Sequence, residues 1–280
     1  MQLPAVGDSS LDQRRRKGLC RMRKIHSQRT TLILVAMLVV ICSLPAMAMT
    51  GQQVIDRVKS EYGDFQSQVV TMRIRTYDGE NLVTDREVLL LTRRSGDAEK
   101  SLIKFLAPKD VEGVGLLDEG EDIMYMYLPE FEKVRRIAGS AKHGSFMGTD
   151  FTYNDLSFVN YDTSDYEAEL MGETEDIYEI ELRDRDQKDA SYEKVLMTVS
   201  KSDWFPTKVV FYNTDGKLQK ELSAFDLTRY GNYRYPKRLE MVDVLANHKT
   251  EILVGEPEFD LDLADDLFTT RTLQRKRIRY

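Results

Sequence analysis

Cysteine is nearly absent from this sequence. The chain has 280 residues and two cysteines, Cys20 and Cys42, both within the first 48 residues. The rest of the chain therefore contains no thiol nucleophile, no thiolate metal ligand and no residue that can form a disulfide. A fold of this length without cross-links has to be stabilised by the burial of apolar side chains.

Residues that commonly carry catalysis are also scarce. Beyond residue 48 the histidines are His143 and His248. The sequence has no Gly-x-Ser-x-Gly elbow, and Gly113-Val114-Gly115 lacks the third glycine and the following helix of a dinucleotide-binding loop. We therefore predict no enzyme, no catalytic residue, no cofactor and no metal site.

Long apolar runs are missing as well. The uninterrupted run Leu32–Cys42 has 11 residues, whereas a membrane-spanning helix needs about 20. It follows a basic segment and precedes Ala46-Met47-Ala48, a small-residue pattern typical of a cleavage site. We predict that residues 1–48 are a cleaved signal peptide rather than a membrane anchor. Residues 49–280 are then one exported domain.

Positive charge is in deficit. Without residues 1–48 the chain keeps 32 basic and 45 acidic residues, a net charge of −13. Nucleic-acid binding requires clustered lysine and arginine, so nucleic acid is disfavoured as a partner. Arg135, Arg136 and the basic C-terminus are local exceptions. They either contact a partner or an anionic membrane, with Arg135 and Arg136 as candidate partner-binding residues, or are simply solvated charges at a strand edge and a terminus.

The apolar pattern changes once along the chain. Thr50-Gly51-Gln52-Gln53 matches a capping box, and the apolar residues that follow recur at helical spacing, so we predict a helix over about 50–62. From Val70 onward the apolar residues alternate, in roughly a dozen segments separated by turns such as Asp78–Asn81. We therefore predict a mainly β fold with a few helices, built from antiparallel hairpins.

Two architectures suit these hairpins, a two-sheet sandwich and one strongly curved sheet. Leu89-Leu90-Leu91 and Ile123–Leu128 are apolar on both faces, so the second face of these strands is either a packed layer or the wall of a cavity. A barrel of about eight strands is filled by its own side chains, whereas more strands leave room for a ligand.

A central stretch is the most distinctive part of the sequence. Phe-Met-Gly-Thr-Asp-Phe-Thr-Tyr-Asn-Asp-Leu, at 146–156, follows the loop-like run Gly139–Ser145. This stretch resembles the signature of the periplasmic outer-membrane lipoprotein-sorting family, the LolA/LolB-like carriers. Shorter pieces agree with it: Phe105-Leu106-Ala107-Pro108, Gly113-Val114-Gly115, Met126-Tyr127-Leu128-Pro129 and Arg135-Arg136-Ile137.

The resemblance implies a fold and a function. The fold would be an open half-barrel, a single strongly curved antiparallel sheet of about eleven strands with helices covering its concave apolar side. The function would be that of a carrier in the periplasm of a Gram-negative type envelope, which binds a lipoprotein acyl chain or another lipid in an apolar cavity. The implied partners are an inner-membrane transporter, such as one of the resistance-nodulation-division type, and an outer-membrane acceptor. The alternative is a non-transporting periplasmic β scaffold or an accessory subunit of a transporter.

Methionine and aromatic residues supply the candidate binding surface, because flexible Met side chains adapt to varied apolar shapes. The methionines on strands and in the central loop also include Met171. The candidate lipid-binding residues are Met72, Ile74, Leu90, Met124, Met126, Phe146, Met147, Phe151, Tyr153, Met197, Phe211 and Met241. We expect a gate at the central loop, with Phe146 and Met147 closing the mouth. The gate and signature residues are Gly144, Phe146, Met147, Gly148, Asp150, Asn154 and Asp155.

Overall fold

Antiparallel hairpins dominate the computed structural model, as the alternating sequence pattern predicts. The structure describes residues 49–62, 65–96, 98–120, 123–156, 163, 166–185 and 190–280. These residues belong to the unit Met49–Tyr280. The signal-peptide prediction for residues 1–48 lies outside the described residues and stays a prediction, as does the division of the chain into domains.

The first described element is helix α2, Gly51–Tyr62, and the capping box forms as predicted. The backbone N–H of Gln53 donates to the Thr50 hydroxyl at 3.2 Å, and the backbone N–H of Thr50 donates to the Gln53 side chain at 2.9 Å. Both bonds satisfy N–H groups that the first helical turn leaves free. The helix buries its apolar face, Val54, Ile55, Val58 and Tyr62, against the sheet.

Within the residues that the structure describes, the sheet has fourteen strands, not about eleven. They are β1 Ser67–Asp78, β2 Asn81–Ser95, β3 Ala98–Ala107, β4 Gly115–Asp118, β5 Met124–Leu128, β6 Lys133–Ile137, β7 Tyr166–Glu173, β8 Ile177–Asp184, β9 Lys194–Ser200, β10 Pro206–Tyr212, β11 Leu218–Tyr230, β12 Tyr233–Asp243, β13 His248–Val254 and β14 Glu258–Phe259. Short 3-10 turns lie at η1 Pro129–Phe131, η2 Gly139–His143 and η3 Asp265–Leu267, before helix α4, Thr270–Leu273.

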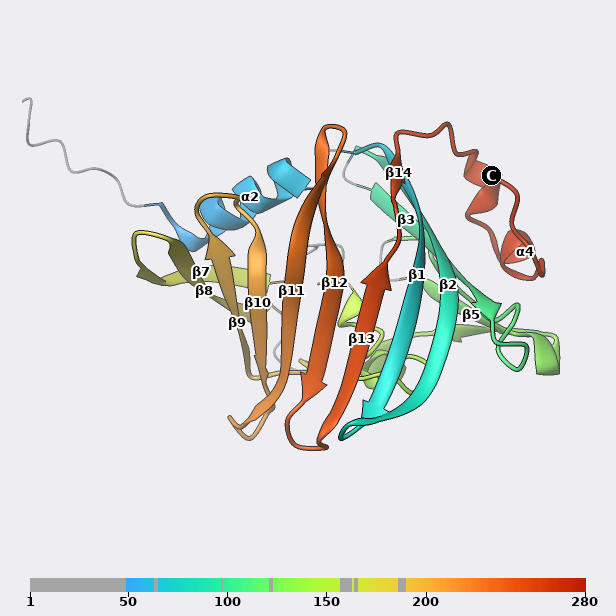
Figure 1. Ribbon diagram of the computed structural model, residues 1–280, viewed down its shortest axis with the longest axis horizontal. Coiled ribbons are helices and arrows are strands. Elements are labelled where there is room, and N and C mark those ends of the chain that lie inside the picture. Colours follow the sequence, from blue (N-terminus) through green and yellow to red (C-terminus); the bar gives the residue numbers. More distant parts are fainter. Residues whose placement is uncertain are drawn as a thin grey trace, which may run out of the picture. The chain divides into compact units, whose positions relative to one another are not determined.

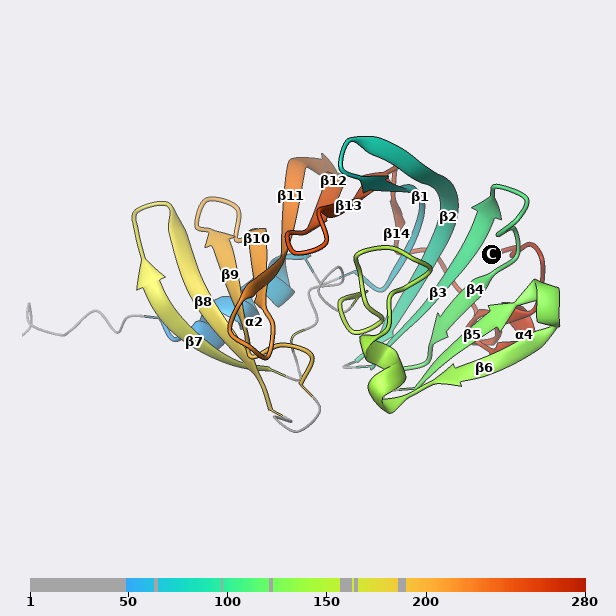
Figure 2. The same cartoon turned by 90° about the horizontal axis from the view of Figure 1, so that it is seen from below.

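A single antiparallel sheet contains all of these strands (Figure 1). The order runs β6-β5-β4-β3-β2-β1-β13-β12-β11-β10-β9-β8-β7, and β14 pairs with β1 beside this path. Strands β1 to β6 form one half of the sheet and β7 to β13 the other. The β1–β13 pair joins the halves, with Met72 opposite Val254 and Asp78 opposite His248. β6 and β7 lie at opposite ends of the order, so the sheet is open. Figure 2 shows that its strands follow an arc.

The two faces of the sheet carry two separate apolar clusters. Leu90 of β2 belongs to one and its neighbours Leu89 and Leu91 to the other, because successive side chains of a strand point to opposite faces. The inner cluster contains Val54, Ile55, Val58, Met72, Ile74, Leu90, Phe105, Met124, Met126, Phe146, Phe151, Tyr153, Met197, Phe211, Leu222, Leu239, Met241 and their buried neighbours. The outer cluster contains Val69, Leu89, Leu91, Leu102, Leu117, Leu263, Leu267, Phe268 and Leu273.

The C-terminal segment explains why the strands are apolar on both faces. Leu263, Leu267, Phe268 and Leu273 cover the outer face, and α4 contacts β4 and β5. Lys104 of β3, which is fully buried, donates from its Nζ to the carbonyl oxygens of Gly113 and Leu273, at 2.6 Å each. The second face of these strands is therefore a packed layer and not a cavity wall.

Of the α-helices that the structure describes, α2 lies with the inner cluster, where it buries Val54, Ile55 and Val58, and α4 lies with the outer one. α2 packs against β7, β8 and β12. The centre of the arc is occupied by the segment Gly139–Asp155 (the central segment), which crosses the concave side between β6 and β7 (Figure 2). In the described part of the chain, no helix has the length and apolarity needed to span a bilayer.

Candidate functional site

The central segment folds on itself as a small hairpin. Ser145 and Thr152 form an isolated antiparallel bridge. The N–H of Phe146 donates to the carbonyl of Phe151 at 2.8 Å, and the N–H of Thr149 donates to the carbonyl of Phe146 at 3.0 Å. These main-chain bonds lie within the segment, so they can persist if the segment moves as one piece.

The turn of this hairpin is strained. Met147 and Gly148 both have positive φ, 54° and 76°. Glycine adopts this conformation readily, but for methionine it costs about 1 kcal/mol because the Cβ crowds the backbone. Met147 is held there partly buried against the inner cluster, with its carbonyl oxygen accepting a hydrogen bond from Nη1 of Arg86 on β2. Burial lowers the pKa of Arg86, and the charge of Asp110 opposes this shift.

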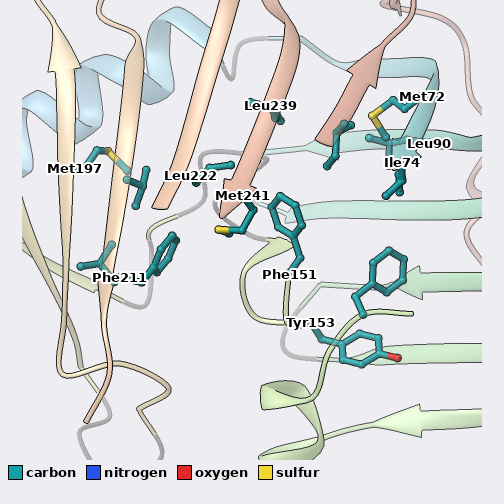
Figure 3. Packing of buried hydrophobic residues seen from close by; sticks show 14 of the residues in the cluster. Met72, Ile74, Leu90, Phe151, Tyr153, Met197, Phe211, Leu222, Leu239 and Met241 are labelled. Carbon is teal, nitrogen blue, oxygen red and sulfur yellow. The ribbon is translucent and has the colours of Figure 1, made fainter. Parts of the chain in front are cut away.

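Three aromatic side chains of the segment fill the space inside the arc. Phe146 is 2% exposed and its ring centroid lies 5.9 Å from that of Phe105 and 5.7 Å from that of Tyr153. Phe151 is 1% exposed. Figure 3 shows Phe151 beside Met241, between the side chains of β1 and β2 on one side and those of β9 to β11 on the other. The segment thus fills the space inside the arc with its own side chains.

Asp150 attaches the segment to β13 and is almost fully buried. Its Oδ2 accepts a hydrogen bond from the Thr250 hydroxyl at 2.6 Å, and its backbone N–H donates back to the same hydroxyl oxygen at 2.9 Å. Its Oδ1 lies 2.7 Å from Nδ1 of His248. The carboxylate therefore links the hairpin to the end of β13.

Asp155 attaches the other end of the segment, and its side chain is fully buried. Oδ2 accepts from Nζ of Lys220 on β11 at 3.0 Å and from the backbone N–H of Thr152 at 2.8 Å. Oδ1 accepts from the Tyr192 hydroxyl at 2.9 Å. Burial, together with the adjacent Asp155 charge, raises the pKa of Tyr192, so the phenol stays protonated and donates. A buried carboxylate with this many donors is well satisfied.

The structure brings the predicted lipid-binding residues together. Eleven are buried members of the inner cluster, and Met147 packs against it. Met171 does not join them, because its side chain is exposed on β7. Arg135 and Arg136 are exposed on β6, at one edge of the sheet. Burial raises the pKa of the Tyr153 hydroxyl, which the positive charge of Arg135 opposes.

The signature residues fall into two kinds. Phe146 and Phe151 pack in the inner cluster, whereas Asp150, Asn154 and Asp155 make polar contacts outside the hairpin, Asn154 through Ser191 at 3.2 Å. Sequence reasoning missed the partners of the two acids, Tyr192, Lys220, His248 and Thr250. It also missed Arg86, which donates to the carbonyl of Met147. A possible signal was the scarcity of histidine, since His248 is one of two beyond residue 48.

A pocket of about 530 Å³ lies on the other side of the sheet, beside the C-terminal segment. It is lined by Lys100, Glu119, Gly120, Ile123, Asp265, Asp266, Phe268 and Thr269, and none of these is a predicted lipid-binding residue. Within the described residues, no three His, Cys, Asp or Glu side chains are placed to hold a metal ion.

This chain is similar to a family of sequences and to several solved structures. A family model with the description "Uncharacterized protein" matches residues 97–275, more than half of the chain. No curated protein matches this chain. A solved structure described as an outer membrane lipoprotein-sorting protein domain, from Vibrio parahaemolyticus, is 26% identical with a TM-score of 0.74, over 80% of this chain and 98% of that one. The resemblance to the lipoprotein-sorting family is thereby confirmed.

Two further structures share the fold. A DUF1329 family protein from Desulfovibrio piger is 24% identical with a TM-score of 0.74, over 80% of this chain and 98% of that one. A LolA superfamily protein from Nitrosomonas europaea is 21% identical with a TM-score of 0.66, over 80% of this chain and its full length. The likeness extends over nearly all of each relative.

Proposed function

The chain belongs to the family whose model spans residues 97–275, and from its lipoprotein-sorting fold we propose that it is a periplasmic carrier of lipid-like cargo. It binds an acyl chain of a lipoprotein or of another lipid on the concave side of its sheet. It acts by binding, not as an enzyme. The cargo passes from an inner-membrane transporter, such as one of the resistance-nodulation-division type, toward an acceptor at the outer membrane.

One observation carries this proposal. The concave apolar surface is covered at its centre by the central segment, which keeps its own main-chain hydrogen bonds and is tied to the sheet through Arg86, Asp150 and Asp155. A permanent core layer would more commonly be a strand or a helix. A hairpin held by side chains is able to leave, and cargo then takes the place of Phe146, Phe151 and Tyr153.

The magnitudes are compatible with exchange. An acyl chain of about 16 carbons gains on the order of 10 kcal/mol on burial, at about 0.8 kcal/mol per CH₂. Three buried aromatic side chains contribute about 2–3 kcal/mol each. The burial free energies of the acyl chain and of the three aromatic side chains are therefore similar. The protein then neither exposes an empty apolar surface nor holds its cargo irreversibly.

The test weakens one attachment of the segment. Asp150→Asn keeps the size of the side chain but removes the charge that His248 and Thr250 contact. Asp215→Asn, on the exposed β10–β11 turn, is the matched control. With a fluorescent fatty acyl probe in stopped flow, we expect Asp150→Asn to speed uptake about 5- to 30-fold, as a change of about 1–2 kcal/mol in the opening equilibrium implies. Equal uptake rates in both variants would contradict the proposal that the central segment acts as a gate.

A scaffold without cargo is the second candidate, and the burial of the aromatic residues favours it. Phe146 and Phe151 are buried to the same degree as most core residues of the sheet, which is what a finished core on the concave side would show. Native mass spectrometry of the gently purified protein separates the two. Co-purified lipid supports the carrier, and an apo mass in repeated preparations, together with no probe uptake, supports the scaffold.

A further inference from the structure

Exposed apolar side chains gather at one end of the sheet. Leu82 and Val83, at the start of β2, are 54% and 58% exposed, and Val244 and Leu245, in the β12–β13 turn, are 45% and 59% exposed. These four residues (the tip patch) are a majority of the large exposed hydrophobic side chains in the described part of the chain. The others are Phe131, Met171 and Tyr280.

The two hairpins that carry the tip patch are neighbours. β1 pairs with β13, with Asp78 opposite His248, and the N–H of Gly79 donates to the carbonyl of Asn247 at 3.1 Å. The β12–β13 turn is well defined, because the Asp243 carboxylate accepts from the N–H groups of Leu245 and Ala246 at 3.0 and 2.8 Å. Val244 and Leu245 are therefore presented outward by an ordered turn, where polar residues are the norm. Leu82 and Val83 lie at the adjoining end of β2.

The tip patch also adjoins the proposed gate. His248 directly follows the β12–β13 turn and contacts Asp150 of the central segment at 2.7 Å. Figure 2 shows the two hairpin ends beside the central segment, in the view from below. A partner that binds the tip patch would therefore lie next to the His248–Asp150 contact, which holds the central segment against the sheet.

We propose that the tip patch inserts into the surface of a lipid bilayer and places the gate against it. Aliphatic side chains on projecting turns suit the acyl region below the headgroups. A protein interface would centre on Trp, Tyr and Arg, whereas Leu and Val are under-represented among the residues that dominate binding there. The carboxylates beside the patch are those of Asp78, Glu80 and Asp243, and Lys249 follows the β12–β13 turn. Acidic charge is in excess here, so the preferred membrane is zwitterionic. This inference rests on the proposed function for its role in cargo exchange, but not for the binding itself.

Vesicle flotation tests the inference without cargo. The full chain is expressed and purified, its mass recording whether residues 1–48 remain, and it is floated with vesicles of phosphatidylcholine and phosphatidylethanolamine. The variant combines Leu82→Ser, Val83→Ser, Val244→Ser and Leu245→Ser. The matched control combines Phe131→Ser and Met171→Ser, which remove equally exposed apolar side chains from other places. Circular dichroism melts show whether each variant is folded.

We expect the tip variant to lose vesicle binding about tenfold or more while the control keeps it, since partitioning scales with inserted apolar area. We also expect no gain on adding phosphatidylglycerol and little loss in salt, since anionic lipid repels Asp78 and Glu80. Equal flotation of variant and control overturns the proposal. So does binding that requires anionic lipid, or a tip patch that contacts only a membrane protein. Binding of the acyl probe in vesicle-free solution is measured on the same variants, so the cargo site can fail separately.

Discussion

The buried pair Lys220–Asp155 is the contact whose loss should lower the free energy of unfolding most. The Asp155 side chain is fully buried and that of Lys220 is 6% exposed, with Nζ and Oδ2 3.0 Å apart. Asp155→Asn removes the negative charge and leaves the ammonium group without it. In the native protein Oδ2 of Asp155 accepts hydrogen bonds from Lys220 and Thr152. An amide NH₂ group in the place of Oδ2 would face these two donors and could not accept from them.

The magnitude follows from this geometry. Removing one partner of a buried ion pair costs about 3–5 kcal/mol, because the remaining charge stays desolvated. Asp155→Asn should cost that amount. Lys220→Met should cost about 3 kcal/mol, at the low end, since the carboxylate keeps the Tyr192 hydroxyl and the Thr152 N–H as donors. With both changes no charge is left unpaired, and we expect the double variant to be about 2–3 kcal/mol more stable than the sum of the single costs implies.

Urea unfolding measures these costs. The chain has one tryptophan, Trp204, which stacks on Tyr178 with ring centroids 5.6 Å apart, so its fluorescence reports on the sheet. Glu173→Gln is the control, since it breaks a surface contact to Lys201 at 2.6 Å and should cost at most about 1 kcal/mol. Hydrogen exchange on Asp155→Asn should in addition show faster exchange in the central segment than in β9 and β10.

Additive costs would refute the reasoning. If the double variant equals the sum of the single variants within about 0.5 kcal/mol, at unchanged slopes against urea, the two side chains do not interact in the folded protein. Uniform acceleration of exchange across the sheet would refute the attachment role instead. Asp155 would then stabilise the whole fold rather than the position of the central segment.

Two further changes probe the outer and inner clusters. Burial lowers the pKa of Lys104 to about 8, from 10.5, so between these values the unfolded chain binds more protons and stability rises with pH. We expect a rise on the order of 3 kcal/mol from pH 8 to 10.5, absent in Lys104→Met, by urea unfolding across pH. A variant that keeps the rise assigns it to other groups. Phe146→Ala should cost about 3–5 kcal/mol and Phe131→Ala, at an exposed site, less than about 0.5 kcal/mol, by thermal unfolding. Equal losses would contradict the burial of Phe146.

Local patterns in the sequence predicted the elements well. The capping box at Thr50 and Gln53, the alternation in the strands and the turn Asp78–Asn81 each depend on residues close in the chain, and each forms as predicted. The central motif was singled out as the candidate gate, and its segment does lie against the concave side.

Tertiary structure alone decided what covers each face. Leu89 and Leu91 are buried because the C-terminal segment, far away in sequence, packs on them, and no local pattern encodes that contact. Likewise Asp150 and Asp155 were predicted as gate and signature residues, but their partners Thr250 and Lys220 lie about 100 and 65 residues further along the chain. Strand count and curvature, too, follow from pairing between distant hairpins, so the open arc and the hairpin inside it became visible only in the folded chain.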